Sequence, residues 1–289
     1  MTAARFKATA DGRLTSEMLA AYRSDGFLVL EDMVSTGQCR ALIAEADQLI
    51  DAFDPETERT VFSAASQAHA DDSNFRASGD KIRFFLEEEA VDGQGRLRRP
   101  KAEAINKIGH ALHDLNPVFD RFSRQPKLAR LVTDLGLAHP LLLQSMQIRK
   151  PPHIGGAVGL HQDAAFLYTE PLSVIGLWFA LQDATRDNGC LWAIPGGQNG
   201  PLRSRFHYCD GRLATESLDS TPLTADLAEP LETPQGTLVV LHGLLPHRSG
   251  ANRSVDWRQA YALHVIDGAC RYAEDNWLRR GPDMPLRGF

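Results

Sequence analysis

The stretch LLLQSMQIR, residues Leu141–Arg149, begins the part of the chain that decides the fold. From here on, short apolar runs alternate with breaks that contain proline or glycine. This texture is typical of all-β folds rather than of alternating strands and helices. The runs that we predict as strands are Leu141–Arg149, Ser173–Leu181, Cys190–Ile194, Thr237–His242 and Gln259–Ile266. This half of the chain is therefore predicted to form a jelly roll.

The N-terminal half carries helix signals instead. Thr15 or Ser16 can cap a first helix that stops at Gly26, and Ser35 or Thr36 can cap a second one with apolar residues at helical spacing up to Phe53. The further elements that we predict are strands at Phe27–Leu30 and Lys81–Leu86, a helix at Pro117–Leu135 and irregular segments at Asp54–Arg76 and Pro201–Pro230. The expected fold is mainly β, a double-stranded β-helix with flanking N-terminal helices.

Length and composition fit one globular domain over residues 1–289, with the β-helix core at about 141–267. Hydrophobic residues make up 43% and charged residues 24% of the 289 residues, which excludes a disordered chain or a coiled coil. A net charge of −6 without a dominant basic stretch argues against nucleic-acid binding. The four cysteines are far apart and form no C-x-x-C, so we expect a reducing, cytoplasmic location. No run has the length of a membrane span or the features of a signal peptide, so we expect no membrane partner.

One pair of residues has the spacing of metal ligands. In an extended His161-Gln162-Asp163, the two outer side chains point the same way and bring an imidazole beside a carboxylate. Two histidines and one carboxylate on one face leave open positions on a metal, as in non-haem Fe(II) oxygenases. His242 and His247 are the candidates for the third ligand, and spacing alone does not choose between them.

At these residues the sequence resembles the Fe(II)- and 2-oxoglutarate-dependent phytanoyl-CoA dioxygenase family. The resemblance runs from Asp25 to Trp277 and rests on His161-Gln162-Asp163, then His247 and Ser249, then Arg258. The runs Ser78–Phe85, Ile105–His113 and Tyr168–Pro171 are similar to the domain-containing protein 1 subgroup of that family. Many members read Pro-Gly-Ser-His where this chain has Pro195-Gly196-Gly197-Gln198, so no role is transferred to that loop.

The resemblance implies a double-stranded β-helix with Fe(II) held by His161, Asp163 and His247, which would be the catalytic centre. It further implies that 2-oxoglutarate is bound by Lys107, Met146, Gln162, Trp178, Ser249 and Arg258. Dioxygen would complete the reaction, in which a small organic substrate is oxidised while 2-oxoglutarate gives succinate and CO₂. Asp163 occupies the ligand position that related halogenases leave free for halide, so the resemblance favours hydroxylation or a related oxidation.

The residues support these roles to different degrees. Arg258 opens a predicted strand, and its planar guanidinium could bind the distal carboxylate of 2-oxoglutarate in bidentate fashion, with Ser249 as an extra donor. Lys107 lies in the apolar run Ile105–Leu112, where a lysine is either solvated or a buried cation that awaits an anion. Met146 and Trp178 are of types that are more often core residues in such strands, and contact with the cosubstrate is compatible with that packing role.

Two alternatives remain open from the sequence. The protein could hold metal and 2-oxoglutarate as a non-catalytic sensor or scaffold, which substrate-free conversion of 2-oxoglutarate to succinate would exclude. It could also be a cupin-like zinc hydrolase, which zinc would activate rather than inhibit. The sequence shows no clustered basic patch for the phosphates of a coenzyme A ester, and it identifies neither the primary substrate nor the oligomeric state.

Overall fold

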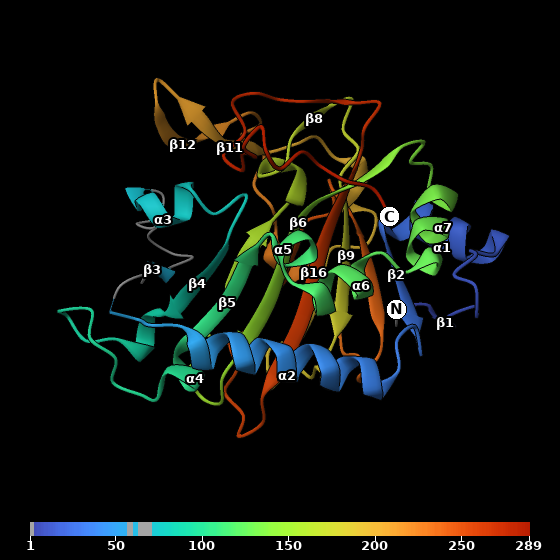
Figure 1. Ribbon diagram of the computed structural model, residues 1–289. Coiled ribbons are helices and arrows are strands. Elements are labelled where there is room, and N and C mark those ends of the chain that lie inside the picture. Colours follow the sequence, from blue (N-terminus) through green and yellow to red (C-terminus); the bar gives the residue numbers. More distant parts are fainter. Residues whose placement is uncertain (1–2, 57–59, 63–70) are drawn as a thin grey trace.

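Two facing β-sheets form the core of the protein in a computed structural model, which describes residues 3–56, 60–62 and 71–289 (Figure 1). The larger sheet contains, in spatial order, β1 (Arg5–Lys7), β2 (Phe27–Glu31), β14 (Leu238–His242), β9 (Ile175–Ala180), β16 (Arg258–Asp267), β6 (Pro140–Lys150), β5 (Ile105–His110), β4 (Ile82–Glu87) and β3 (Thr60–Phe62). The smaller sheet contains β13 (Glu229–Leu231), β10 (Leu191–Ala193), β15 (His247–Ser249) and β7 (Val158–His161). This arrangement confirms the double-stranded β-helix.

Smaller elements surround the two sheets. Two short sheets pair β11 (Ser204–Cys209) with β12 (Arg212–Ser217) and β17 (Arg271–Tyr272) with β8 (Thr169–Glu170). The helices are α1 (Ser16–Asp25), α2 (Thr36–Ala52), α3 (Ser73–Arg76), α4 (Lys101–Ala104), α5 (Leu112–Leu115), α6 (Pro117–Ser123) and α7 (Pro126–Asp134), with the 3₁₀ turns η2 (Glu88–Ala90), η3 (Asp163–Ala165), η4 (Gly197–Asn199) and η5 (Ala225–Leu227). No helix in the described part of the chain has both the length and the apolar character to cross a bilayer.

The predicted helix starts are confirmed at atomic level. The hydroxyl of Thr15 accepts a hydrogen bond from the backbone N–H of Met18, and Ser35 does the same for Gln38. Gly26 ends α1 in the left-handed conformation, at φ 79°. The N-cap residues are therefore Thr15 and Ser35, the first of each pair that the sequence allowed.

Three predictions about elements were wrong. The helix predicted over Pro117–Leu135 is two helices, α6 and α7, because the Pro126 ring cannot continue α6 and instead begins α7. The segment Pro201–Pro230, predicted as irregular, contains the β11–β12 hairpin. The segment Asp54–Arg76 contains β3 and α3, and its residues 57–59 and 63–70 lie outside the described part of the chain.

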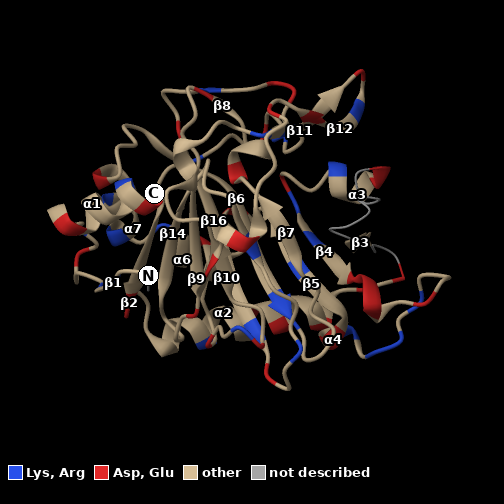
Figure 2. Cartoon of the chain, turned by 180° about the vertical axis from the view of Figure 1, so that it is seen from behind, with Lys and Arg blue, Asp and Glu red and all other residues tan. Residues whose placement is uncertain are grey.

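Alternation along the large sheet creates two separate layers. Leu28 and Leu30 of β2 face one side, where they pack with α2 in the main core, while Phe27 and Val29 face the smaller sheet. Figure 1 shows α2, α5 and α6 in front of the large sheet, and Figure 2 shows β10 and β7 of the smaller sheet from behind. The helices therefore close the outer face, and the inner face is left for a cavity between the sheets.

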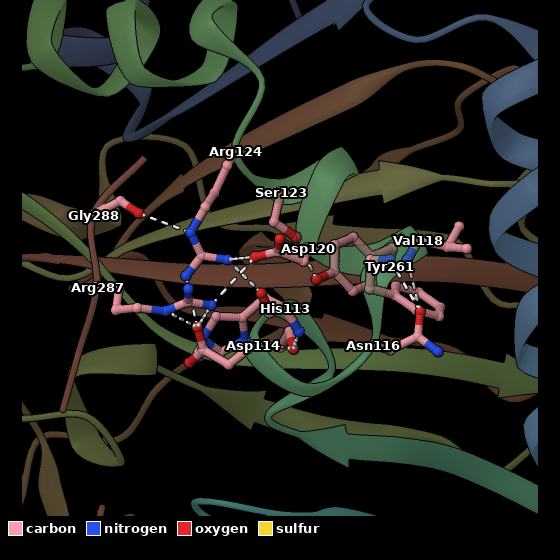
Figure 3. A network of polar contacts seen from close by, with 12 residues as sticks. His113, Asp114, Asn116, Val118, Asp120, Ser123, Arg124, Tyr261, Arg287 and Gly288 are labelled. Atoms are coloured by element: carbon pink, nitrogen blue, oxygen red, sulfur yellow. Dashed lines mark hydrogen bonds and ion pairs between the residues drawn. The ribbon is translucent and has the colours of Figure 1, made fainter. Parts of the chain in front are cut away.

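A network of ion pairs fastens the C-terminal segment to the helical layer (Figure 3). The carboxylate of Asp114 on α5 lies 2.6 Å from Arg124, 2.7 Å from Arg280 and 2.8 Å from Arg287. Burial alone would raise the pKa of Asp114, but His113, Arg280 and Arg287 outweigh it and hold the pKa well below its usual range. One carboxylate thus joins α5, the residue that follows α6 and the last part of the chain.

We expect Asp114→Asn to lower the free energy of unfolding at neutral pH by about 3–5 kcal/mol, because it leaves the buried guanidinium of Arg280 without a counter-charge. A carboxyl with a lowered pKa stabilises the folded state above its unfolded pKa of about 3.9, and the effect is lost as the pH falls toward the folded pKa. The difference between wild type and variant should therefore shrink below about pH 4. Urea unfolding across this pH range measures it, with exposed Asp226→Asn as control. Equal effects of the two variants would contradict the role of the network.

Candidate active site

A cavity of about 310 Å³ lies between the two sheets. Its floor is the inner face of β6, where Gln144, Met146, Ile148 and Lys150 all line it at intervals of two residues. Residues from β16 alternate in the same way beside them. The residues that line the cavity therefore follow from the alternation of side chains along these strands.

Three side chains meet at the wall of this cavity and form the candidate metal centre. His161 ends β7 and His247 begins β15, and the antiparallel pairing of these strands places the two residues directly opposite each other. Asp163 Oδ1 lies 3.6 Å from His161 Nε2 and 3.7 Å from His247 Nε2. The three ligand atoms lie within 4.8 Å of one another, close enough to hold one metal ion.

Backbone hydrogen bonds prepare both histidines for metal binding. His161 Nδ1 lies 2.8 Å from the carbonyl oxygen of Gly159, and His247 Nδ1 lies 3.0 Å from that of Leu245. A carbonyl can only accept, so each Nδ1 carries the proton and each Nε2 keeps its lone pair. The tautomer that binds a metal through Nε2 is therefore set by the fold.

The two histidines of the triad differ in their electrostatics. Burial would lower the pKa of His161, but the adjacent carboxylate of Asp163 outweighs burial and raises it. Burial alone would raise the pKa of Asp163, but the adjacent histidines hold it well below the usual range, so the carboxylate is ionised. Burial lowers the pKa of His247 to about 4, so its imidazole is neutral at physiological pH. A charged carboxylate with a neutral imidazole is the donor set that a divalent metal ion needs.

His242 is excluded from the triad by position. Its Nδ1 accepts a hydrogen bond from the backbone N–H of Leu244 at 3.1 Å, and its ring lies 6.1 Å from that of Tyr22. It lines a separate hollow near α1. The choice between His242 and His247, which the sequence left open, is decided by the pairing of β15 with β7.

A third histidine, His264, contacts Asp163 from the large sheet. His264 Nε2 lies 3.3 Å from Asp163 Oδ2, the oxygen that faces away from the other two ligands. A Cβ atom at Gly176 would lie 2.8 Å from the same oxygen, so a side chain there would displace the carboxylate. His264 and the missing side chain at Gly176 together fix the direction of Asp163.

The other end of the cavity is cationic. Arg258 is 1% exposed, and its Nε and Nη1 find no hydrogen-bond partner in the described structure. Burial lowers the pKa of Arg258 to about 9. Ser249 and Trp178 line the same cavity, and the guanidinium carbon of Arg258 lies 5.6 Å from the Trp178 ring. A buried guanidinium with free N–H groups fits an anionic ligand.

Two lysines, Lys150 and Lys107, line the cavity together with Arg258. The ammonium of Lys150, the register partner of Arg258, donates to the carbonyl of Gly156, whose N–H donates to Glu87. Lys107 points inward from β5 and lies 3.2 Å from the centre of the Phe62 ring. Burial lowers the pKa of Lys107 to about 7, so it is not the solvated lysine that composition alone would favour.

Gln162 does not reach the cavity. Its amide donates to the carbonyls of Pro201 and Leu244 at 3.2 and 2.8 Å, and its oxygen accepts from the N–H of Arg203 at 2.9 Å. These bonds tie the metal-binding segment to the chain that enters the β11–β12 hairpin. The role in binding 2-oxoglutarate that the resemblance gave to Gln162 is therefore corrected to a structural one.

The sequence analysis missed His264, Gln144 and Lys150. A signal for each was present, because His264 lies an even number of residues from Arg258, and Gln144 and Lys150 lie at even spacing from Met146. In an extended strand, even spacing puts side chains on one face.

Comparisons with known proteins agree with this site. The family model for phytanoyl-CoA dioxygenase matches residues 22–260. The chain is 41% identical over 270 residues to "Phytanoyl-CoA dioxygenase" of Arabidopsis thaliana, covering 93% of this chain and 95% of that one. It is 42% identical over 283 residues to "Phytanoyl-CoA dioxygenase domain-containing protein 1" of Bos taurus, covering 94% and 97%.

Solved structures support the fold. The α-ketoglutarate-dependent carbocyclase SnoK from nogalamycin biosynthesis superposes with a TM-score of 0.65 at 17% identity, covering 96% of this chain and 98% of its own. EctD from S. alaskensis with 2-oxoglutarate and 5-hydroxyectoine gives 0.63 at 20% identity, covering 95% and 87%. At these identities the likeness concerns the fold alone.

We expect His247→Ala to lower the affinity for Mn(II), a stand-in for Fe(II), by more than about 100-fold, because it removes a ligand and not merely a supporting contact. His242→Ala should leave the affinity within about twofold of wild type, since removing a residue remote from the metal changes no ligand. Calorimetric titration of the metal-free proteins with Mn(II) measures both. Loss of binding in the His242 variant alone would overturn the assignment.

We expect His264→Leu to weaken Mn(II) binding by about 10- to 100-fold, as loss of a residue that orients a ligand does. His264→Gln keeps an N–H donor and should recover most of the affinity. The absorption spectrum of the Co(II)-loaded variants reports the ligand geometry independently of activity. Exposed His139→Leu is the control, and an unchanged affinity and spectrum in His264→Leu would remove His264 from this role.

Proposed function

Since the chain belongs to the phytanoyl-CoA dioxygenase family, we propose that it is an Fe(II)- and 2-oxoglutarate-dependent oxygenase that hydroxylates a small organic substrate. The observation that carries the proposal is the shape of one cavity, with a two-histidine, one-carboxylate triad on its wall and an unpartnered buried arginine at its end. The triad suits a metal ion with open coordination positions, and the buried arginine suits the distal carboxylate of a dicarboxylate.

His161, Asp163 and His247 would hold Fe(II) through two Nε2 atoms and one carboxylate oxygen. The metal, when bound with 2-oxoglutarate and dioxygen, would supply the oxidant for a C–H bond, with succinate and CO₂ as the products of 2-oxoglutarate. The chain contributes positioning, since the hydrogen bonds to Gly159 and Leu245 hold both imidazoles in place.

Arg258 and Ser249 would bind the distal carboxylate of 2-oxoglutarate, and Met146 and Trp178 would pack against its carbon chain. Lys107 would provide a second cationic contact. The described residues offer Arg258 no carboxylate within 4.0 Å, so its buried charge awaits an anion from outside the chain. An anionic cosubstrate relieves the desolvation of both cations at once.

The direct test of the proposed function is succinate formation. Protein loaded with Fe(II) and supplied with 2-oxoglutarate and dioxygen should release succinate and CO₂ in equal amounts, slowly even without a primary substrate. Zinc in place of iron should abolish the reaction. A protein that binds 2-oxoglutarate but never converts it would be a sensor or scaffold instead.

We expect Arg258→Ala to weaken 2-oxoglutarate binding by one to three decades, on the order of 1.4 kcal/mol per decade, because the distal carboxylate loses its partner in a dry site. Lys107→Met, which keeps the aliphatic stem, should also weaken binding while the Mn(II) affinity stays unchanged. Anaerobic calorimetry of the Mn(II) protein measures both, with exposed Arg212→Ala as control. Wild-type affinity in either variant would remove that residue from the site.

Calorimetry also tests Lys107 through its protonation. Burial lowers the pKa of Lys107 to about 7, so the amine is largely neutral at mildly alkaline pH. An adjacent carboxylate favours the charged form, so binding of 2-oxoglutarate should take up a proton there. Lys107→Met should abolish this uptake.

A further inference from the structure

The cavity extends past the metal triad, away from Arg258. On β6, Lys150 lies at one end of the inward-facing row and Gln144 at the other, about 20 Å apart along the strand at about 3.3 Å per residue. Gln144 pairs with His264, the residue that contacts Asp163, so this end begins beside the metal centre. The space beyond the triad is therefore distinct from the part assigned to 2-oxoglutarate.

Aromatic rings form the walls of this second space. Phe75 stacks on Trp277 with ring centres 4.5 Å apart, and His110 meets Trp277 edge-on at 5.2 Å. Phe166 and Phe206 add a second side, with ring centres 5.7 Å apart. Phe166 also contacts the ring of the metal ligand His161, with centres 5.9 Å apart. We call Gln144 and these five aromatic residues the substrate compartment.

The substrate compartment has two polar side chains, Gln144 and His110, and His110 Nδ1 lies 2.8 Å from the hydroxyl oxygen of Ser78. Gln144 is 4% exposed, lines the cavity, and its side-chain amide makes no hydrogen bond to any described residue. Its neighbour Gln147 faces the opposite side of β6 and donates a hydrogen bond to Gln259 at 2.6 Å. An amide that faces a cavity and has no partner in the described structure fits a ligand that can both donate and accept.

Among the residues that the structure describes, none leaves an unassigned charge in the substrate compartment. The charged side chains that line the whole cavity are Lys107, Lys150, Asp163, Arg248 and Arg258. Asp163 belongs to the metal, and Lys150 is hydrogen-bonded to Gly156. The guanidinium carbon of Arg248 lies 4.6 Å from the centre of the Trp192 ring. Lys107 and Arg258 are assigned to 2-oxoglutarate. A charged substrate group would therefore remain unpaired beside the aromatic walls.

We propose that the substrate compartment takes a compact, uncharged, largely apolar group that carries an amide-like function, which pairs with the side-chain amide of Gln144 while a neighbouring C–H bond faces the metal. This inference rests on the proposed function. The cavity volume limits the substrate to a compact group. Small-molecule sites measure about 300–1,000 Å³, so this cavity, at about 310 Å³, is near the lower limit, and 2-oxoglutarate would take part of it. The aromatic walls favour a ring or a short branched chain.

The test uses three pairs of probes that differ in charge but little in shape: benzamide and benzoate, cyclohexanecarboxamide and cyclohexanecarboxylate, hexanamide and hexanoate. The paramagnetic Mn(II) ion enhances the proton relaxation of any probe that binds beside it, which NMR measures in the anaerobic complex with 2-oxoglutarate. The Zn(II) form provides the diamagnetic baseline. We expect at least one carboxamide to be relaxed strongly and each carboxylate to bind more weakly than its carboxamide.

Gln144→Leu should weaken binding of the carboxamide by about 3- to 10-fold, the effect of one hydrogen bond, and leave the affinity for 2-oxoglutarate unchanged. Gln94→Leu, in an exposed turn, is the matched control. If Gln144→Leu fails to fold, Phe75→Leu against Phe84→Leu tests the wall, because Phe84 lies on the outer face of β4 and stacks on Phe53.

The outcomes separate this inference from the proposed function. Failure of the Mn(II) protein to bind 2-oxoglutarate contradicts the proposed function. If 2-oxoglutarate binds, the inference alone is overturned by stronger binding of carboxylates, by absence of relaxation for every carboxamide, or by equal carboxamide affinity in Gln144→Leu and wild type. Preference for carboxylates would reassign Lys107 to the primary substrate.

Discussion

Alternation of side chains along β6 and β16 is the constraint on which the rest of the structure depends. Outward-facing Tyr261 and Leu263 bury against the helical layer, while Arg258 and His264, on the same strand, line the cavity. A slip of one residue in register would exchange these faces, placing an arginine in the apolar core and leucines at the metal. The register of the two strands, fixed by the core, therefore also fixes the distance between the cationic end and the metal triad.

The triad adds a second requirement, since its ligands come from two strands that are remote in sequence. Antiparallel pairing of β15 with β7 brings His247 opposite His161, and backbone carbonyls fix both tautomers. Gln162 lies between the two ligands His161 and Asp163. Its side-chain amide is hydrogen-bonded to the backbone of Pro201 and Arg203, in the chain that leads into the β11–β12 hairpin. Phe206 on β11 is part of the aromatic wall, so this one segment serves both the metal and the substrate compartment.

Local pattern predicted the helix caps, the His161–Asp163 pair and the strands β2, β4, β6, β9, β10, β14 and β16, because each depends on spacing within a few residues. It did not predict β7 and β15, which carry the two histidines of the triad. The third ligand could not be chosen, since His242 and His247 differ only in which strand pairs with which. The strand period applied to His161-Gln162-Asp163 already turns Gln162 away from its neighbours, so the period was the better guide there than the resemblance. The aromatic wall could not be predicted at all, because Phe75, Phe206 and Trp277 meet only through the tertiary fold.

The C-terminal segment connects stability to the site. Trp277 completes the wall of the substrate compartment, and three residues later Arg280 pairs with the buried carboxylate of Asp114 at 2.7 Å. Arg280 also donates to the carbonyl of Leu143 at 2.9 Å, the residue that precedes Gln144 on β6. The ion pairs on the helical side thus hold Trp277 and the floor around Gln144 in one arrangement. Because a buried ion pair depends on geometry to offset its desolvation, it stabilises that one arrangement over alternatives in which the segment is shifted. The network around Asp114 is accordingly part of what shapes the space next to the metal, although none of its charges enters that space.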